Sequence, residues 1–132
     1  MGPLTLFFDR TFGTRLPKAL SSMNPPVTIK WHQEEGFAID APDDEWLGKV
    51  GPKRWVVISQ DRKWHTVESE LAAIKQHNIR CFYLPCASDP RWFSLCLFTK
   101  IHEKIMELAD SETPPFIFDV TKKGKFQLVN LP

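Results

Sequence analysis

Short apolar runs alternate along this chain with segments in which apolar residues recur every three or four positions. The first pattern is typical of buried β-strands, and the second is typical of helices with one apolar face. Strands are expected at residues 4–8, 27–31, 55–59 and 79–84, and helices at 14–23, 43–50, 66–77 and 90–109. Strands joined through helices run parallel, because each connection has to cross the sheet. The sequence therefore predicts an α/β fold with a mostly parallel sheet between two layers of helices.

The end of the chain has the pattern of a β-hairpin. Residues 116–120 and 126–129 are strand-like runs on either side of a turn that contains Gly124. We expect an antiparallel hairpin at residues 116–130, attached to a core formed by residues 4–109. A length of 132 residues and a hydrophobic content of 42% are typical of one folded unit, so residues 1–132 are assigned to a single domain.

Two polar residues are expected to cap helices at their N-terminal ends. Thr66 precedes the helix predicted to end at residue 77. Asp89 is followed by Pro90, and proline fits the first turn of a helix because that turn needs no backbone N–H donor.

Three aspartates stand where a fold of this kind gathers functional side chains. Asp9 follows the run 4–8, and Asp61 follows the run 55–59. The carboxyl ends of parallel strands lie at one edge of the sheet, and open α/β sheets bind ligands there. Asp43 begins a predicted helix 18 positions before Asp61. Because clustered carboxylates repel one another and oxygen ligands suit hard cations, the three acids are candidate ligands of Mg²⁺ or Mn²⁺.

Each of these acids also has a purely structural interpretation. Asp9 could end a strand, Asp43 could cap its helix, and Asp61 could begin a turn. Nearby acids widen the choice of ligands. Asp44 and Glu45 are weaker candidates in the same helix, and the preceding loop offers a fourth ligand from among Glu34, Glu35 and Asp40.

Basic residues near the acids are candidates for binding RNA. The chain has 17 basic and 16 acidic residues, so nucleic-acid binding requires a local patch of positive charge. Phosphate contacts are expected from Arg10, Arg62, Lys63 and His65, and a base could stack on Trp64. The alternative is that these residues form a solvated surface loop.

Several other functional classes leave no motif in the sequence. There is no P-loop, no GxGxxG, no GxSxG and no HExxH, and Cys81, Cys86 and Cys96 are expected to be buried apolar side chains. A phosphotransferase with Asp9 as nucleophile would usually have an aspartate at position 11, where this chain has threonine. Since no stretch is apolar enough to span a membrane or to serve as a signal peptide, a soluble, cytoplasmic protein is expected.

Two parts of the chain carry a family resemblance. The first is Phe7-Phe8-Asp9 followed by the helical segment Arg15-Leu16-Pro17-Lys18-Ala19-Leu20. The second is Pro42-Asp43-Asp44-Glu45-Trp46-Leu47 followed by a strand that ends in Ser59-Gln60-Asp61-Arg62. In their order and spacing they resemble PIN-like domains of the short, VapC-related kind, over about residues 4–109.

The resemblance implies a three-layer α/β/α fold and an endoribonuclease that depends on Mg²⁺ or Mn²⁺. It implies that Asp9, Asp43 and Asp61 are the catalytic, metal-binding acids, that RNA is the substrate, and that the protein is the toxin of a toxin–antitoxin pair with a cognate antitoxin as partner. The chain departs from longer members, because the helix that carries an additional glutamate in those enzymes is missing.

This departure motivates an alternative from another functional class, a non-catalytic PIN-like scaffold that binds a partner protein or RNA. A homodimer is a further expectation, because the last helix and the hairpin are rich in aromatic residues that could form an interface. These residues could equally pack in the protein's own core: Trp92, Phe93, Phe98, Phe116, Phe118 and Phe126.

Overall fold

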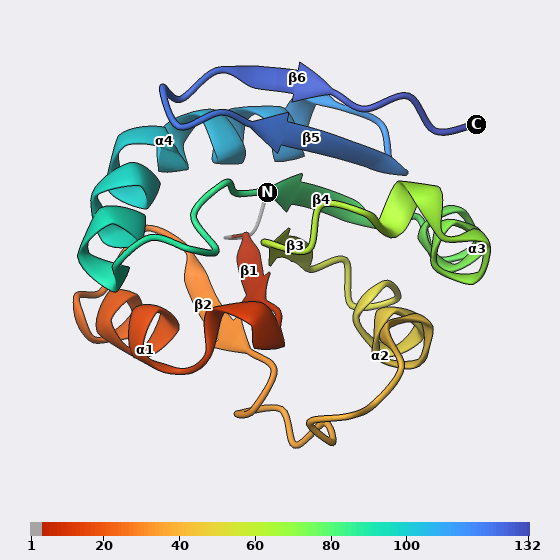
Figure 1. Cartoon of the computed structure of the whole chain (residues 1–132), viewed down its shortest axis with the longest axis horizontal. Coiled ribbons are helices and arrows are strands. Elements are labelled where there is room, and N and C mark those ends of the chain that lie inside the picture. Colours follow the sequence, from red (N-terminus) through yellow and green to blue (C-terminus); the bar gives the residue numbers. More distant parts are fainter. Residues whose placement is uncertain (1–3) are drawn as a thin grey trace.

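A six-stranded sheet with the order β2-β1-β3-β4-β5-β6 forms the centre of the molecule (Figure 1). The structure is a computed structural model that describes residues 4–132. The first five strands are parallel, and β6 is antiparallel to β5. The strands are β1 (Thr5–Phe8), β2 (Thr28–Trp31), β3 (Val56–Ser59), β4 (Arg80–Tyr83), β5 (Phe116–Val120) and β6 (Phe126–Leu128).

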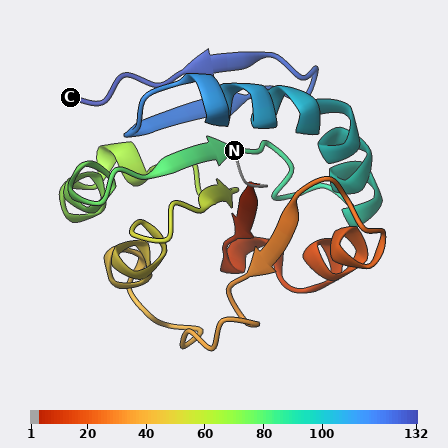
Figure 2. The same ribbon diagram turned by 180° about the vertical axis from the view of Figure 1, so that it is seen from behind.

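Two pairs of helices cover the two faces of the sheet, as both views show (Figures 1 and 2). One pair is α1 (Arg15–Ser22) and α4 (Arg91–Ser111), and the other is α2 (Asp43–Val50) and α3 (Glu68–Gln76). Two short 3₁₀ helices, η1 (Arg10–Phe12) and η2 (Trp64–Thr66), follow β1 and β3. The predicted α/β fold with two helical layers and a mostly parallel sheet is confirmed.

The continuous apolar runs of the strands follow from this layering, since successive residues of a strand point to opposite faces. On β1, Leu6 and Phe8 pack in the core shared with α1 and α4, whereas Phe7 packs in the core shared with α2 and α3. Val57 on β3 also lies in this second core, while its neighbours Val56 and Ile58 lie in the first. Each face of the sheet therefore has its own apolar core.

The C-terminal hairpin is more closely built into the fold than the sequence predicts. Its two strands are antiparallel as expected, but β5 also pairs with β4 in parallel and is a full member of the sheet. Phe116 and Phe118 on β5 are buried against Phe82, and Phe98 of α4 is buried in the same core. Most of the aromatic residues that could have formed an interface are therefore used inside the protein.

Two expected helix caps are wrong. Thr66 belongs to η2 and donates its hydroxyl to the carbonyl of Lys63 at 2.7 Å, while α3 begins two residues later. Asp89 lies outside α4, because Pro90 is the N-cap and the Asp89 carboxylate pairs with Lys122 at 3.3 Å.

Cys81 and Cys86 are buried as expected, but Cys96 is exposed. Residues 1–3, which the sequence analysis places in the same domain, lie outside the described residues. In the described part of the chain, no helix combines the length and apolar character required to cross a membrane.

Candidate functional site

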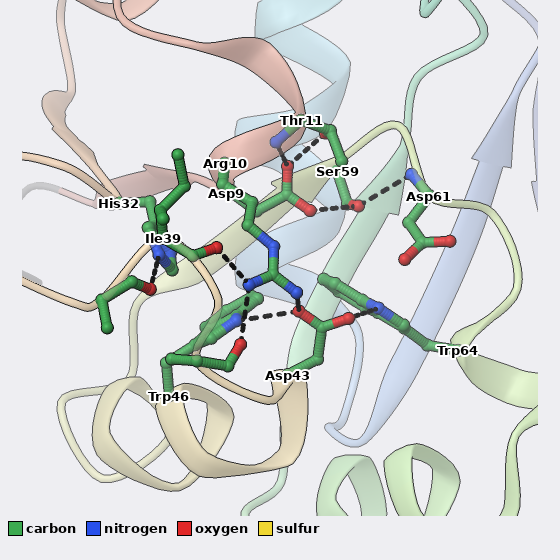
Figure 3. A network of polar contacts seen from close by, with 12 residues as sticks. Asp9, Arg10, Thr11, His32, Ile39, Asp43, Trp46, Ser59, Asp61 and Trp64 are labelled. Atoms are coloured by element: carbon green, nitrogen blue, oxygen red, sulfur yellow. Dashed lines mark hydrogen bonds and ion pairs between the residues drawn. The ribbon is translucent and has the colours of Figure 1, made fainter.

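The strand order changes direction at β1, and the candidate acids lie beside this point. The chain passes from β1 outward to β2 and then returns to β3 on the other side of β1. Asp9 follows β1 directly, and Asp61 comes two residues after the end of β3, so both lie at the carboxyl edge of neighbouring parallel strands. Such a switch in strand order is where open α/β sheets bind ligands. Asp43, the first residue of α2, faces the same region (Figure 3).

Asp9 is buried, with 1% of its surface exposed, and both of its oxygens accept hydrogen bonds. Its Oδ1 accepts from the Thr11 backbone N–H at 3.1 Å and from the Thr11 hydroxyl, and its Oδ2 accepts from Ser59 Oγ at 2.5 Å. Burial raises the pKa of the Asp9 carboxyl to about 7, and the Asp43 charge adds to this effect, although the hydroxyl donors oppose it. The local contacts therefore fix the position of Asp9 without fully compensating its charge.

Ser59 connects Asp9 to Asp61. Its hydroxyl donates to Asp9 and accepts a hydrogen bond from the backbone N–H of Asp61 at 3.0 Å. The Asp61 carboxylate is only partly buried and lies 4.0 Å from Lys63 Nζ. Burial raises the pKa of Asp61, and Asp43 adds to this, while Lys63 opposes it. Asp61 is thus the acid of this pair that solvent can reach.

Asp43 is held by side chains from three segments of the chain (Figure 3). Its Oδ1 accepts from Arg10 Nη2 at 3.1 Å and from Trp46 Nε1 at 2.9 Å, and its Oδ2 accepts from Trp64 Nε1 at 3.0 Å. The alternative role of Asp43 as an N-cap is wrong, because Pro42 occupies that position and no side chain caps the helix. Asp43 instead fixes the start of α2 against η1 and η2.

Arg10 ties the loop before α2 to the end of β1. Besides Asp43, its guanidinium donates to the backbone carbonyls of Ile39 at 2.8 Å and Ala41 at 2.7 Å. His32 contacts the same loop, through its Nε2 and the carbonyl of Ala38 at 3.0 Å. The loop carbonyls and Asp43 thus surround Arg10 with negative charge.

Glu70, in the first turn of α3, is an acid of this region that the sequence analysis does not identify. Burial and the charges of Asp43 and Asp61 together raise its pKa to about 6. Its Oε2 is buried and has no hydrogen-bond partner within residues 4–132. No sequence signal marks Glu70, since it resembles any acid in the first turn of a helix.

The other acids considered as ligands point elsewhere. Asp44 and Glu45 are exposed, and Asp40 is exposed in the loop. The remaining two loop acids form ion pairs away from the site, Glu34 with Lys30 at 3.8 Å and Glu35 with Lys53 at 4.0 Å.

Comparison with known proteins decides the family. A family model described as a PIN like domain matches residues 4–86, which is more than half of the chain. The chain belongs to the PIN-like domain family. No curated protein and no solved structure matches it. PIN-like domains are generally nucleases, and the matched residues include the four acids Asp9, Asp43, Asp61 and Glu70.

In this PIN-like domain the acids are near one another but are not gathered into one coordination shell. Within residues 4–132, no three histidine, cysteine, aspartate or glutamate side chains form a group that could hold a metal ion. Asp43 is engaged by one guanidinium and two indoles, and Asp9 by three donors. A carboxylate has about four acceptor sites, so each keeps little free capacity.

Most of the expected RNA-binding residues are also engaged within the protein. Arg62 pairs with Asp119 at 2.6 Å, and His65 Nδ1 lies 3.2 Å from the hydroxyl of Tyr83. Trp64 is fully buried, so the expectation that a base stacks on it is wrong. Lys63 remains well exposed and is directed toward Asp61. Of the expected set, Lys63 is therefore the residue most available to a phosphate.

Proposed function

We propose that this PIN-like domain is an endoribonuclease that depends on Mg²⁺ or Mn²⁺. The observation that carries the proposal is the incomplete compensation of negative charge at the carboxyl edge. Burial raises the pKa values of Asp9, Asp61 and Glu70, and the charge of Asp43 adds to each of these increases. Raised pKa values of this kind are concentrated at functional sites, where a bound ligand or a proton transfer makes use of the perturbed carboxylate.

The donor chemistry of the region fits a hard divalent cation. All four acids offer oxygen ligands, and the buried Oε2 of Glu70 lacks a hydrogen-bond partner in the described part of the chain. Asp9, Asp43 and Asp61 do not form a metal-binding group within residues 4–132, so to hold the ion they would have to exchange some of their present hydrogen bonds for it, with Glu70 close to two of them. When bound, such an ion activates a water molecule and stabilises the charge that develops on the phosphate.

The protein's own residues would prepare this site. Thr11 and Ser59 fix the Asp9 carboxylate, and Ser59 also holds the backbone of Asp61. Asp61 is the acid best suited to accept a proton from the attacking water, because its carboxylate is partly exposed and its pKa is raised. Lys63, beside it, would face the phosphate.

The proposal is tested by cleavage of a mixed RNA pool with Mn²⁺ or with EDTA. We expect the wild-type protein to cleave RNA in Mn²⁺ but not in EDTA. Asp61→Asn should lower the cleavage rate about a hundredfold or more. Asp44→Asn is the matched control, because Asp44 is an exposed acid near the same site. This variant should cleave RNA like wild type. The stability of Asp61→Asn should be unchanged or higher, since the neutral amide avoids the cost of burying a charge. Equal cleavage by Asp61→Asn and wild type would refute the proposal.

A second candidate function is favoured by the contacts of Arg10. A guanidinium bound to Asp43 and to two loop carbonyls already supplies positive charge where an ion would bind. This arrangement suits a non-catalytic scaffold that binds RNA or a partner protein. Binding of the same RNA pool without cleavage in Mn²⁺ would support the scaffold over the nuclease.

The family resemblance suggests the cellular setting of the proposed activity, a toxin neutralised by a cognate antitoxin. Induced expression in a host cell should then arrest growth, and Asp61→Asn should relieve the arrest. Equal arrest by wild type and variant would separate any toxicity from the acidic site.

A further inference from the structure

An exposed tryptophan on α4 lies over a hollow between α1 and α4. Trp92 has 73% of its surface exposed, which is unusual for so large an apolar side chain. The hollow beneath it has a volume of about 180 Å³, and its lining is mostly apolar: Arg15, Leu16, Ala19, Arg91, Trp92 and Leu95. The fold uses neighbouring aromatic residues such as Phe98 in its core but leaves Trp92 in solvent.

Two arginines connect this hollow to a second one. Arg15 and Arg91 also line a hollow of about 510 Å³, together with Phe12, Gly13, Thr14, Asp89 and Pro90. Neither arginine forms an ion pair or a side-chain hydrogen bond within residues 4–132, in contrast to Arg10 and Arg62. The acid in the lining, Asp89, is already paired with Lys122 at 3.3 Å. The positive charge of the two arginines is therefore free to meet an anion.

The helices do not compensate this charge. Arg15 is the first residue of α1 and Arg91 is the first residue of α4, and neither helix has an acid in its first turn. By contrast, α2 and α3 each begin with acidic residues, which is the stabilising arrangement. Arginine at the start of a helix adds positive charge to the positive end of the helix dipole, so the fold itself gives no reason for this placement.

The patch formed by Arg15, Arg91 and Trp92 lies at the same edge of the sheet as the acids. η1 and two further residues connect Asp9 at the end of β1 to Arg15, and the loop that follows β4 leads to Arg91. Because β1 and β4 belong to the same parallel set, both connections leave from the carboxyl edge. A ligand that lies along this edge would pass from the patch to the acids.

We propose that Arg15, Arg91 and Trp92 bind a single-stranded segment of RNA that leads to the acidic site. This inference rests on the proposed function. The two guanidiniums would contact successive phosphates, and an unpaired base would stack on the indole of Trp92. Unpaired guanidiniums beside an exposed indole match the alternating negative phosphates and flat bases of a single strand. A protein segment on the same patch is the competing occupant.

The test measures binding of a fluorescein-labelled, mixed-sequence RNA oligonucleotide through its fluorescence anisotropy. The measurement is made in EDTA so that cleavage does not interfere. We expect Trp92→Ala to weaken binding about tenfold, as for the loss of one stacked base. The double variant Arg15→Ala/Arg91→Ala should lower the slope of log affinity against log salt by about 1.4, or about 0.7 for each lost phosphate contact.

Two matched variants make the result specific. Trp92→Phe keeps a flat ring and should retain most of the affinity, which separates stacking from a change in folding. Arg54→Ala removes another exposed arginine, at the opposite edge of the sheet where β3 begins, and should bind like wild type. Because the side chains of the patch lie at the surface, circular dichroism should show the wild-type fold in every variant.

The outcomes separate this inference from the proposed function. If the patch variants bind RNA as tightly as wild type while Mn²⁺-dependent cleavage persists, the RNA-binding role of the patch is wrong and the proposed nuclease activity stands. If the patch variants lose binding but wild type cleaves nothing, the patch stands on a non-catalytic RNA-binding scaffold. If wild type binds no RNA in EDTA, the patch does not bind RNA, and a protein is the occupant to test. If wild type also cleaves no RNA in Mn²⁺, the proposed nuclease is wrong as well.

Discussion

Protonation of Asp9 is linked to folding, because the carboxyl is buried. Its pKa is about 7 in the folded protein, against an ordinary value of 3.8 that we take for the unfolded chain. Between these values the folded state holds a proton that the unfolded state has lost, so stability decreases as pH rises through this range. From Asp9 alone, the free energy of unfolding should fall by about 2 kcal/mol between pH 5 and pH 7.

Urea unfolding at pH 5, 6 and 7 in EDTA measures this effect. Asp9→Asn removes the titrating group, so its free energy of unfolding should fall less steeply over the same range. Part of the slope should remain, since the pKa of Glu70 is raised to about 6 and that of Asp61 is also raised. An identical slope in Asp9→Asn and wild type would show that Asp9 is ionised throughout.

Arg10 occupies the position from which a cation would approach Asp43. Replacing it by Gln should lower the free energy of unfolding by about 1–3 kcal/mol, because Asp43 and two loop carbonyls lose a charged donor. The same change should raise the affinity for Mn²⁺ in titration calorimetry, because a competing positive charge is gone. Arg62→Gln is the control, since its partner Asp119 lies on β5. Lower Mn²⁺ affinity in Arg10→Gln would show that Arg10 organises the site.

Whole helices and strands follow from the sequence where a local pattern decides them. The helix predicted at residues 43–50 matches α2, because Trp46, Leu47 and Val50 mark its buried face and Gly51 its end. The predicted helix caps at Thr66 and Asp89 were wrong because these side chains contact other residues, the Lys63 carbonyl and the Lys122 ammonium group. The pairing of β5 with β4 was missed because a hairpin signal reports the partner within the hairpin alone.

The candidate site is predictable only in part, for a related reason. Strand ends placed Asp9 and Asp61 at one edge, but the partners of Asp43 come from positions 10 and 64, far from it in sequence. Spacing along one element cannot report such contacts. Glu70 enters the region through the packing of α3 beside α2, which no local pattern encodes.

The position of α2, and with it Asp43, depends on a close approach at Gly51. A Cβ atom at Gly51 would lie 2.6 Å from Cβ of His77 and 2.8 Å from its carbonyl oxygen. Gly51→Ala should therefore lower the free energy of unfolding by about 1–3 kcal/mol in urea, because α2 must shift from the end of α3. Gly48→Ala is the matched variant. Its Cβ meets only the far end of the His77 ring, so a gain in helix propensity should offset most of the strain. Equal effects of the two variants would contradict a specific contact at Gly51.

The whole molecule extends well past the part that the family model matches. Residues 87–132 contribute α4, β5 and β6, and these elements complete the core on one face and one edge of the sheet. The predicted homodimer remains a prediction, but its candidate surface is smaller than the sequence suggested. Of the aromatic residues considered for it, Trp92 and Phe93 are the exposed ones, and Trp92 belongs to the patch that we propose binds RNA.

The C-terminal tail closes the sheet, which gives a prediction for the molecule as a whole. β6 covers the edge of β5, Val129 and Leu131 pack against the core of α2 and α3, and Lys75 Nζ donates to the carbonyl of Pro132. A chain that ends at residue 121 should lose about 3 kcal/mol of stability through the exposed apolar side chains. It should also aggregate, because an uncovered strand edge pairs with other chains.

Light scattering at micromolar concentration and urea unfolding measure both effects. The full chain with Val129→Ala/Leu131→Ala serves as the control, since it loses apolar packing but keeps β6 on the edge. This variant should be less stable than wild type yet remain free of aggregates. If the shortened chain is as monodisperse and as stable as wild type, the tail is dispensable for the fold. Aggregation of the shortened chain but not of the control would assign solubility to the covered edge of β5 and not to the apolar contacts of the tail.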